Sequence, residues 1–300
     1  MRGALRDRAR EQAARDGTDQ ADLLERFYLQ RLLARVFSSS TADQWVLKGG
    51  QAMLLRHPNA RHSHDIDLYH RQAADAEAAA VELRSAAEHD LGDMVTFVFG
   101  KCAALPEAAH GTRLLFSARI GGQESARVKV DLVVGLAPVA EPVLYQLEPP
   151  FPMPQGFPEP DPVVACYHPI DHLADKVCAL FERHGPEHNL STRVRDLVDI
   201  ILIARRSSLD GELLRSALDS EVARRNGRAG ITLTLPPEFA VPNPAWRTSY
   251  PTSAKDARDI APYDSWEHSP AFVETLLNPV LAHDARPGTW SPTSLSWAMR

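Results

Sequence analysis

The stretch from Lys48 to Tyr69 constrains this chain more than any other part of its sequence. It begins with the run Lys48-Gly49-Gly50, passes through an apolar helical turn and ends in the run RHSHDIDLY. Side chains alternate between the two faces of a strand, so Asp65 and Asp67 are expected on one face while the residue between them points into the core. The sequence therefore predicts a short helix followed by a strand that presents two carboxylates.

These residue types suit the handling of a triphosphate. Carboxylate oxygens are hard ligands for Mg²⁺, and two such ions about 3.5–4 Å apart can hold the attacking and leaving oxygens of an in-line displacement. Glycines let backbone N–H groups approach a phosphate without an intervening side chain. We therefore expect Asp65 and Asp67 to bind metal close to Gly49 and Gly50.

A third carboxylate lies downstream, on a strand that otherwise has the pattern of a core strand. The runs 113–120 and 127–134 are strand-like and are joined by a glycine-containing loop, which predicts a β-hairpin. In the second run the apolar residues share one face, whereas Lys129 and Asp131 lie on the other. A carboxylate in mid-strand is costly unless it is paired or binds a metal. We therefore take Asp131 as the third acid of the metal site.

The order of the predicted elements indicates an α/β protein. Helices are expected over about 19–37 and 72–90, whereas the proline-dense segment 138–162 should contain no regular element. From Pro169 the pattern becomes helical, with a first helix up to Gly185 and a tail after Pro287 that is expected to be loose. We predict a mixed-sheet core with N-terminal helices over residues 1–150 and a mainly helical C-terminal domain over 151–300, which completes the active-site cleft.

Composition excludes several classes of protein. Apolar residues make up 44% and charged residues 24% of the 300 positions, as in ordinary globular domains. The net charge of −6 argues against a uniformly basic nucleic-acid binder but allows a local basic groove. The three cysteines have no C-x-x-C spacing, no apolar signal segment follows the charged N-terminus, and no apolar run reaches the ~20 residues of a membrane span. We expect a cytoplasmic protein that does not associate with membranes.

The order of the motifs resembles the AbiEii-type nucleotidyltransferase toxins of bacterial toxin–antitoxin systems, within the polymerase-β-like nucleotidyltransferase superfamily. The resemblance covers about residues 24–205. The wider superfamily has Gly-Ser where this chain has Gly49-Gly50, so a nucleophile-side hydroxyl is missing there, and Ser63 could supply a phosphate contact instead. The matching residues are, in order, Lys48-Gly49-Gly50, Arg61-x-Ser63-x-Asp65-x-Asp67, Lys129-Val130-Asp131, a helix with Lys176 and Arg183, and Arg195-Asp196 with Asp199.

This resemblance implies a role for each matching position. Lys176 would meet the nucleotide phosphates, and Asp196 would be the late acidic residue of a catalytic site that also contains Asp65 and Asp67. Negative charge builds up at the attacked phosphorus, and metal ions and a lysine would stabilise it. The implied nucleotide-binding residues are Lys48, Gly49, Gly50, Ser63, Lys176 and Arg183.

The implied activity is the Mg²⁺-dependent transfer of a nucleoside monophosphate from an NTP to RNA, with loss of pyrophosphate. The acceptor end of tRNA would be the target, and its modification would block translation and growth unless a cognate antitoxin intervened. Arginines of the C-terminal helices could form a groove for RNA phosphates. They are Arg193, Arg195, Arg205, Arg206, Arg224, Arg225 and Arg228.

Alternatives stay open for several residues and for the activity as a whole. Asp196 could form a structural ion pair with a neighbouring arginine, Arg183 could extend to solvent from a helix end, and Ser63 could only hydrogen-bond a turn. A small molecule or a protein could be the acceptor, and the chain could also be a non-catalytic nucleotide- or RNA-binding module. A zinc hydrolase is suggested by four histidines, but a metallo-β-lactamase pattern would need Asp and then His where Ile66 and Asp67 stand. These histidines are His57, His62, His64 and His70.

Overall fold

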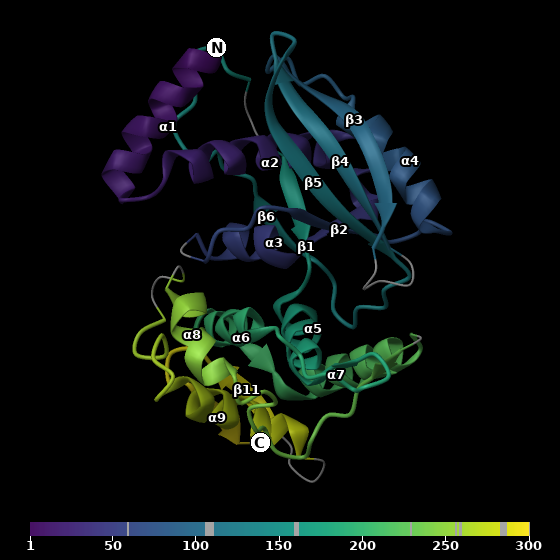
Figure 1. Cartoon of the computed structure of the whole chain (residues 1–300), viewed down its shortest axis with the longest axis vertical. Coiled ribbons are helices and arrows are strands. Elements are labelled where there is room, and N and C mark those ends of the chain that lie inside the picture. Colours follow the sequence, from purple (N-terminus) through teal and green to yellow (C-terminus); the bar gives the residue numbers. More distant parts are fainter. Residues whose placement is uncertain are drawn as a thin grey trace. The chain divides into compact units, whose positions relative to one another are not determined.

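The computed structural model of the chain divides into two compact units (Figure 1). Unit 1 comprises Met1–Arg56, His62–Leu136 and Pro142–Cys166, and unit 2 comprises His57–Arg61, Ala137–Glu141 and Tyr167–Arg300. The residues that the structure describes are 1–58, 60–105, 111–158, 162–228, 230–255, 257, 260–282 and 287–299.

A mixed seven-stranded sheet forms the centre of unit 1. Its strands are β1 (Trp45–Lys48), β2 (Ile66–His70), β3 (Val95–Ala104), β4 (Gly111–Ile120), β5 (Gln123–Val134), β6 (Val143–Gln146) and β7 (Val163–Cys166). They lie side by side in the order β3-β4-β5-β2-β1-β7-β6. β2 pairs with β5, and β1 with β7, in parallel, whereas the other neighbours are antiparallel.

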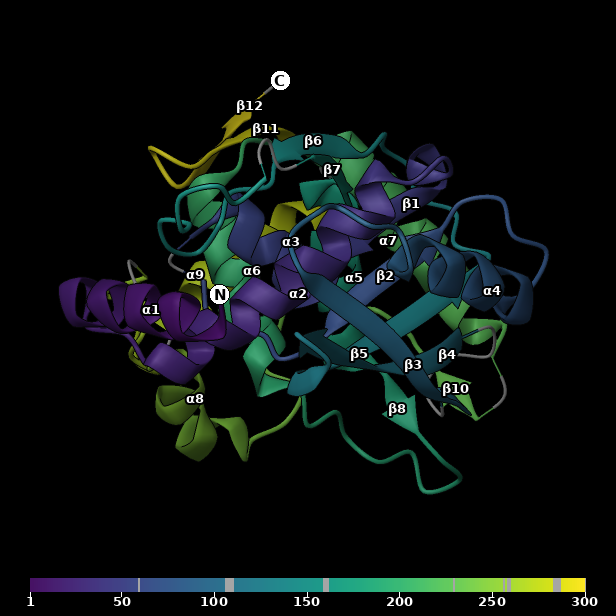
Figure 2. The ribbon, with the colours of Figure 1, turned by 90° about the horizontal axis from the view of Figure 1, so that it is seen from above.

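The predicted hairpin of β4 and β5 is confirmed. Its turn is Gly121-Gly122, and both glycines have positive φ, as the tight hairpin turns require. Along β4 every second residue is buried, and in β5 Val130 and Leu132 face the same core while Lys129 and Asp131 face away. In Figure 2 the long strands β3, β4 and β5 overlap in projection, and β5 is the neighbour of β2 in the sheet.

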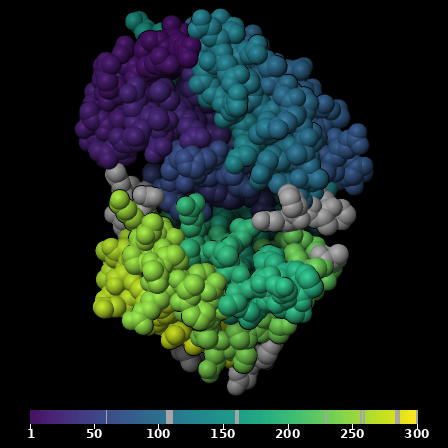
Figure 3. Space-filling view, in the orientation of Figure 1, coloured from purple at the N-terminus to yellow at the C-terminus, as the bar shows by residue number. Residues whose placement is uncertain are grey.

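Helices cover the apolar face of this sheet. α2 (Gln20–Ser38) begins at Asp19, whose carboxylate accepts a hydrogen bond from the Ala21 N–H at 2.6 Å. α2 and α4 (Ala76–Ala87) pack together and contact the strands, and their apolar residues share one cluster with Ile66 and Leu68. α1 (Arg2–Asp16) packs on α2, and the two form one continuous purple surface in Figure 3.

A buried ion cluster fastens α2 to the start of β3. Arg31 Nε lies 2.8 Å and Arg35 Nη2 lies 2.6 Å from the carboxylate of Asp93, and all three side chains are almost fully buried. Burial alone would raise the pKa of Asp93, but the hydrogen bonds and charges of Arg35 and Arg31 lower it below its usual value. The core therefore holds this carboxylate in its ionised form.

Unit 2 is mainly helical. Its helices are α5 (Pro169–Phe181), α6 (Val194–Arg206), α7 (Gly211–Asn226), α8 (Trp246–Ala254) and α9 (Ser269–Leu281). One small sheet pairs β8 (Arg183–His184) with β10 (Ile231–Thr232), and another has the order β12-β11-β9, from Ser296–Met299, Pro287–Ser291 and Leu209–Asp210. α5 packs against both α6 and α7. The predicted fold class, an α/β mixed-sheet core followed by a helical C-terminal part, is confirmed.

The proline-dense segment 138–162 contains a strand that the sequence pattern did not predict. β6 pairs with β7 at the edge of the sheet, with Val143 opposite Cys166. The four residues of β6 follow Pro142 but contain no proline, and an edge strand needs a hydrogen-bonding partner on one side only. The expectation that this segment lacks regular structure is therefore wrong.

The helix that carries Lys176 ends earlier than predicted. α5 stops at Phe181, and the buried carboxylate of Glu182 binds Arg225 of α7. The next two residues form β8, so Arg183 lies on a strand and is exposed. Arg183 therefore does not share a helical face with Lys176, contrary to the prediction.

The C-terminal tail is built into the core of unit 2, so the prediction of a loose tail is wrong. The Trp290 side chain is fully buried, and its ring centroid lies 6.0 Å from that of Phe272 and 5.5 Å from that of Trp297. Its indole N–H donates to the Ala204 carbonyl oxygen at 2.7 Å. Sequence reasoning also missed α8, because Pro251 in its interior hides the helical pattern.

Two further expectations concern the cysteines and membranes. Cys102 is exposed, Cys166 and Cys178 are buried, and all three are free thiols. Among the helices in the described ranges, none combines the length and apolar character needed to span a bilayer.

Replacing Trp290 tests whether the tail stabilises unit 2. Trp290→Ala should lower the free energy of unfolding by about 3–5 kcal/mol, because it leaves a large cavity. Trp290→Phe keeps most of the ring contact and loses the hydrogen bond to Ala204, so it should cost about 1–2 kcal/mol. Urea unfolding measures both, and a cost below about 1 kcal/mol for the alanine variant would show that the tail contributes little.

Candidate active site

A row of charged side chains crosses one face of the unit 1 sheet. Lys48 of β1 lies opposite Asp67 of β2, and Asp67 lies opposite Asp131 of β5. Arg113 of β4 continues the row on the far side of Asp131. Because side chains at paired positions share a face, the four charges stand next to one another, with the cations at the two ends. The structure thus brings together Lys48, Asp67 and Asp131 of the predicted site.

Asp65 lies just before β2 rather than on it. The strand begins at Ile66, and the amino group of Lys129 lies 3.5 Å from the Asp65 carboxylate. Ser63 is buried in the preceding segment, where its hydroxyl donates to Asp65 Oδ1 at 3.3 Å. Residues 62–64 have no strand pairing, so Ser63 does not lie on β2. Its hydroxyl nevertheless meets the first aspartate.

The two glycines allow the start of α3 (Gly49–Arg56) to approach this segment closely. Gly49 has φ of +60°, and a Cβ atom there would lie 1.8 Å from Asp67 Oδ2. A Cβ on Gly50 would lie 2.3 Å from the Ser63 hydroxyl oxygen. The side chain of Gln51, also on α3, donates to the Ser63 carbonyl oxygen at 2.8 Å. Asp67 and Ser63 therefore occupy space that only glycines leave open.

Arg113 is a residue of this face that the sequence analysis missed. Its Nε and Nη2 atoms each lie 2.6 Å from an oxygen of Asp131. The hydrogen bond to Asp131, opposed by burial and aided by the charges of Asp131, Asp65 and Asp67, raises the pKa of Arg113. The Gly121-Gly122 turn alone would place Arg113 opposite Val130, and the irregularity between Ala118 and Arg119 shifts the register by one residue to Asp131, so the sequence pattern could not reveal the pair.

The carboxylates on this face fit a hard divalent cation. The side chains of Asp65 and Asp131 are 33% and 15% exposed, so an ion can reach them from solvent. Carboxylate oxygens are the ligands that Mg²⁺ prefers. Asp131 would have to share its carboxylate oxygens between Arg113 and the ion, since both oxygens already accept hydrogen bonds from Arg113. Asp65 and Asp67 therefore fit the role of metal ligands more directly than Asp131 does.

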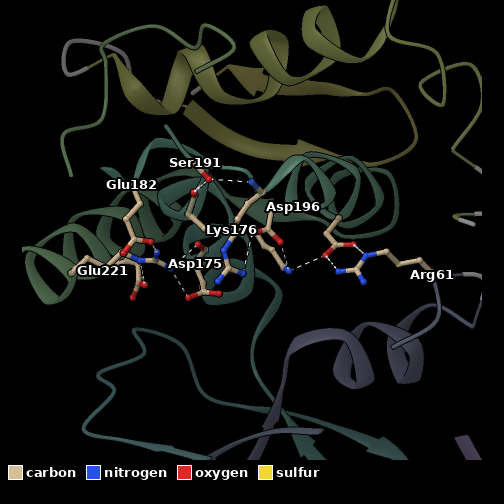
Figure 4. A network of polar contacts seen from close by, with 11 residues as sticks. Arg61, Asp175, Lys176, Glu182, Ser191, Asp196 and Glu221 are labelled. Atoms are coloured by element: carbon tan, nitrogen blue, oxygen red, sulfur yellow. Dashed lines mark hydrogen bonds and ion pairs between the residues drawn. The ribbon is translucent and has the colours of Figure 1, made fainter. Parts of the chain in front are cut away.

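In unit 2, Lys176 lies at the centre of a buried ion network (Figure 4). Its amino group lies 2.7 Å from Asp196 and 2.8 Å from Asp199, both on α6. Asp199 also accepts two hydrogen bonds from Arg61, at 3.1 and 2.9 Å. Asp196 lies 3.8 Å from Arg193 as well, so its main partner is the lysine rather than a neighbouring arginine.

Electrostatics keeps Lys176 and Asp199 ionised. Burial alone would lower the pKa of Lys176, but Asp196 and Asp199 raise it above its usual value. For Asp199, burial would raise the pKa, and the charges and hydrogen bonds of Lys176 and Arg61 lower it well below its usual range. Two cations and two anions thus balance one another, and the two carboxylates account for two of the three N–H donors of Lys176.

Most of the arginines expected to contact RNA are engaged within unit 2. Arg225 is buried and binds Glu182, Glu221 and Asp175, as Figure 4 shows in part. Arg224 and Arg228 also lie at these acidic side chains. Arg205 donates to the carbonyl oxygens of residues 260 and 261. All four of these arginines are partly or fully buried. The exposed members of the set are Arg193, Arg195 and Arg206.

The contact between Gly49 and Asp67 makes a prediction about stability. Gly49→Ala and Gly121→Ala both place a side chain at positive φ, which costs about 1–2 kcal/mol. Nothing lies within 4 Å of the Cβ position of Gly121, whereas Gly49→Ala would also displace Asp67, at a further cost of about 1–3 kcal/mol. Urea unfolding of the two variants measures the difference, and equal losses would contradict the close contact.

The buried network makes a prediction about acid stability. Because the pKa of Asp199 is lowered on folding, its contribution to stability is present above its ordinary pKa of about 3.9 and is lost as the pH falls towards the lowered value. Asp199→Asn should therefore lower the free energy of unfolding at pH 7 and flatten its decline on acidification. Asp219→Asn, which changes an exposed carboxylate of α7, is the control. Identical pH profiles for the two variants would contradict the assignment.

Comparison with known proteins identifies the family and confirms the resemblance drawn from the motifs. A family model described as nucleotidyl transferase AbiEii toxin, type IV TA system, matches residues 31–276. The fold is similar to that of MenT4, a nucleotidyltransferase toxin from Mycobacterium tuberculosis H37Rv, with a TM-score of 0.54 and 15% identity over 90% of this chain and 93% of that one. JHP933 from Helicobacter pylori matches with a TM-score of 0.42 and 15% identity, over 70% of this chain and 77% of that one. No curated protein matches the sequence. The chain belongs to the AbiEii family of nucleotidyltransferase toxins of type IV toxin–antitoxin systems.

Proposed function

We propose that this toxin is a Mg²⁺-dependent enzyme that transfers a nucleoside monophosphate from an NTP to RNA, at the acceptor end of tRNA. Such a modification would block translation and arrest growth, and a cognate antitoxin would hold the activity in check. The observation that carries the proposal is that Asp67 and Asp131 lie side by side on one sheet face, with Asp67 against Gly49 and Asp65 just before β2. Three carboxylates beside the start of a helix suit a metal-bound triphosphate.

The side chains of this face would divide the work between them. Asp65 and Asp67 would hold Mg²⁺, which when bound supplies a Lewis acid that neutralises charge on the phosphates. The Ser63 hydroxyl orients the Asp65 carboxylate by donating to it. Lys129 near Asp65 and Arg113 on Asp131 reduce the repulsion between the carboxylates.

The start of α3 would receive the triphosphate. The first N–H groups of a helix have no partner within the helix, and they attract anions. Gly49 and Gly50 add no side chain of their own at this end of α3, where Asp67 and Ser63 pack closely, and Lys48 adds a cation immediately before it. The acceptor hydroxyl would then form a bond to the α-phosphorus as the bond to the bridging oxygen breaks and pyrophosphate leaves.

The ion network of unit 2 bears on the proposed roles of Lys176 and Asp196. The amino group of Lys176 is buried and saturated with negative charge by Asp196 and Asp199. We propose that the network fixes Lys176 so that its remaining N–H can meet a phosphate, while Asp196 holds it in place. Arg183, exposed on β8, stays a candidate nucleotide contact.

The acceptor is proposed from charge as well as from family. Arg193, Arg195 and Arg206 are the exposed arginines of the set, and they lie near the two ends of α6. Phosphate contacts by such side chains release counterions, so binding should weaken steeply with salt. A small-molecule acceptor would not show this dependence on exposed arginines.

Transfer assays with Asp67→Asn test the proposed activity. The purified chain is incubated with each α-labelled NTP, Mg²⁺ and total tRNA, and the RNA is resolved on a denaturing gel. Wild type should label tRNA, and Asp67→Asn should lower the rate by about 10²–10³-fold because it removes one charged ligand. Asp43→Asn, which changes an exposed carboxylate just before β1, is the matched control and should keep the wild-type rate.

Three results would contradict parts of the proposal. Equal labelling by wild type and Asp67→Asn would remove this aspartate from the mechanism. Label that appears only on a small molecule or on protein would exclude RNA as the acceptor. Labelling that persists in chelator without divalent ions would exclude the metal.

A further inference from the structure

Two histidines and a glutamate of unit 1 converge on one point beside the segment that carries Ser63. His62 Nε2 lies 3.0 Å and His64 Nδ1 lies 2.7 Å from the same oxygen of Glu25, Oε2. The two imidazole rings meet edge to face, with centroids 4.6 Å apart. One ligand atom from each of the three residues lies within 4.8 Å of the other two. The three side chains thus present two nitrogens and one oxygen to a shared position.

We propose that Glu25, His62 and His64 form a binding site for a first-row transition ion of the Zn²⁺ class. Imidazole nitrogens suit zinc, copper and nickel, whereas Mg²⁺ prefers oxygen ligands alone. Ligand atoms around a tetrahedral zinc lie about 3.3 Å apart, given metal–ligand bonds of about 2.0–2.1 Å. The separations of 3.0 and 2.7 Å from Glu25 Oε2 need only a small expansion to admit the ion.

The surroundings provide an entry path and a fourth ligand position. The side chains of His62, Glu25 and His64 are 20%, 32% and 67% exposed, so the site opens to solvent. Asp22 lies one helical turn before Glu25 on α2, and its Oδ1 is 4.0 Å from His62 Nε2. Asp22 or a water molecule can complete four-coordination.

Metal binding here would act on the neighbouring carboxylates through the backbone. His62 and His64 flank Ser63, and Asp65 follows directly. An ion bridging both histidines to Glu25 would fasten this segment to α2, and so would restrict the backbone that positions Ser63 and Asp65. This site differs in ligand chemistry from the all-oxygen face of Asp65, Asp67 and Asp131, so the two should select different ions.

Zinc titration of the full-length chain tests the site. Chelator-treated protein in a buffer with excess Mg²⁺ is titrated with ZnSO₄ by calorimetry, and Co²⁺ serves as a visible probe of coordination. We expect one Zn²⁺ per chain and the absorption bands of four-coordinate Co²⁺. His64→Gln and Glu25→Gln should each weaken Zn²⁺ binding by more than about 100-fold, since even outer partners of a metal ligand change affinity by 10–100-fold.

Two control variants separate this site from other metal ligands. His89→Gln changes an exposed histidine outside the cluster and should keep wild-type Zn²⁺ binding. Asp67→Asn should also keep it, because Asp67 belongs to the proposed Mg²⁺ face. Loss of Zn²⁺ binding in Asp67→Asn, with binding intact in His64→Gln, would overturn the assignment.

Hydrogen exchange supplies a readout that does not depend on catalysis. Zn²⁺ should slow exchange of the amides of residues 62–65 in the wild type and leave them unchanged in His64→Gln. The side chain of His64 is largely exposed, so this variant should fold as the wild type does. Absence of Zn²⁺ uptake at micromolar free ion, or uptake and protection that persist in both His64→Gln and Glu25→Gln, would overturn the proposal.

Discussion

The close approach of Asp67 to Gly49 is the contact on which the candidate active site depends. A left-handed glycine joins β1 to α3, and the carboxylate of Asp67 takes the space that any other residue would fill with its Cβ atom. Ser63 fits against Gly50 in the same way. A helix start, a hydroxyl and a carboxylate can therefore share a small volume. The superfamily's Gly-Ser pair would not fit here, because the Ser63 side chain already fills the space beside residue 50.

The aspartates of the ion pairs described above differ in how deeply they are buried. Asp93, Asp196 and Asp199 are nearly fully buried, and each has a buried or half-buried cation at hydrogen-bonding distance. Such carboxylates are costly without their partners, so their main effect is to hold elements together. Asp65, just before β2, and Asp131 on β5 are more exposed, and their partners Lys129 and Arg113 are themselves partly exposed. A cation from solution can reach these two carboxylates.

The sequence predicted the parts of the fold that depend on local pattern. Alternation along 113–134 and the glycine loop were enough to place the hairpin, and therefore to put Lys129 and Asp131 on the polar face. The resemblance predicted the right family from motifs in order. It could not show that Lys176 is buried between two aspartates, because that depends on how α5 and α6 pack.

The features that the sequence predicted wrongly have one physical cause in common, which is contact with residues far away in the chain. Arg183 lies outside α5, which ends at Phe181, and the residue between them, Glu182, binds Arg225 of α7, 43 residues further along the chain. The tail is ordered because Trp290 fills a gap between helices, and β6 forms because β7 offers it an edge. The pairing of Glu25 with His62 and His64 likewise joins α2 to a distant segment. Hydrophobic periodicity within one segment of the sequence cannot reveal contacts with residues that lie far away in the chain.

Anomalous scattering from crystals grown with Mn²⁺ and a non-hydrolysable NTP analogue would test the central claim most directly. We expect a metal peak bonded to carboxylate oxygens of Asp65 and Asp67, at the roughly 2.1 Å typical of small divalent ions, with the triphosphate against Gly49 and Gly50. A metal and a triphosphate bound together elsewhere, with both aspartates free of metal, would contradict it.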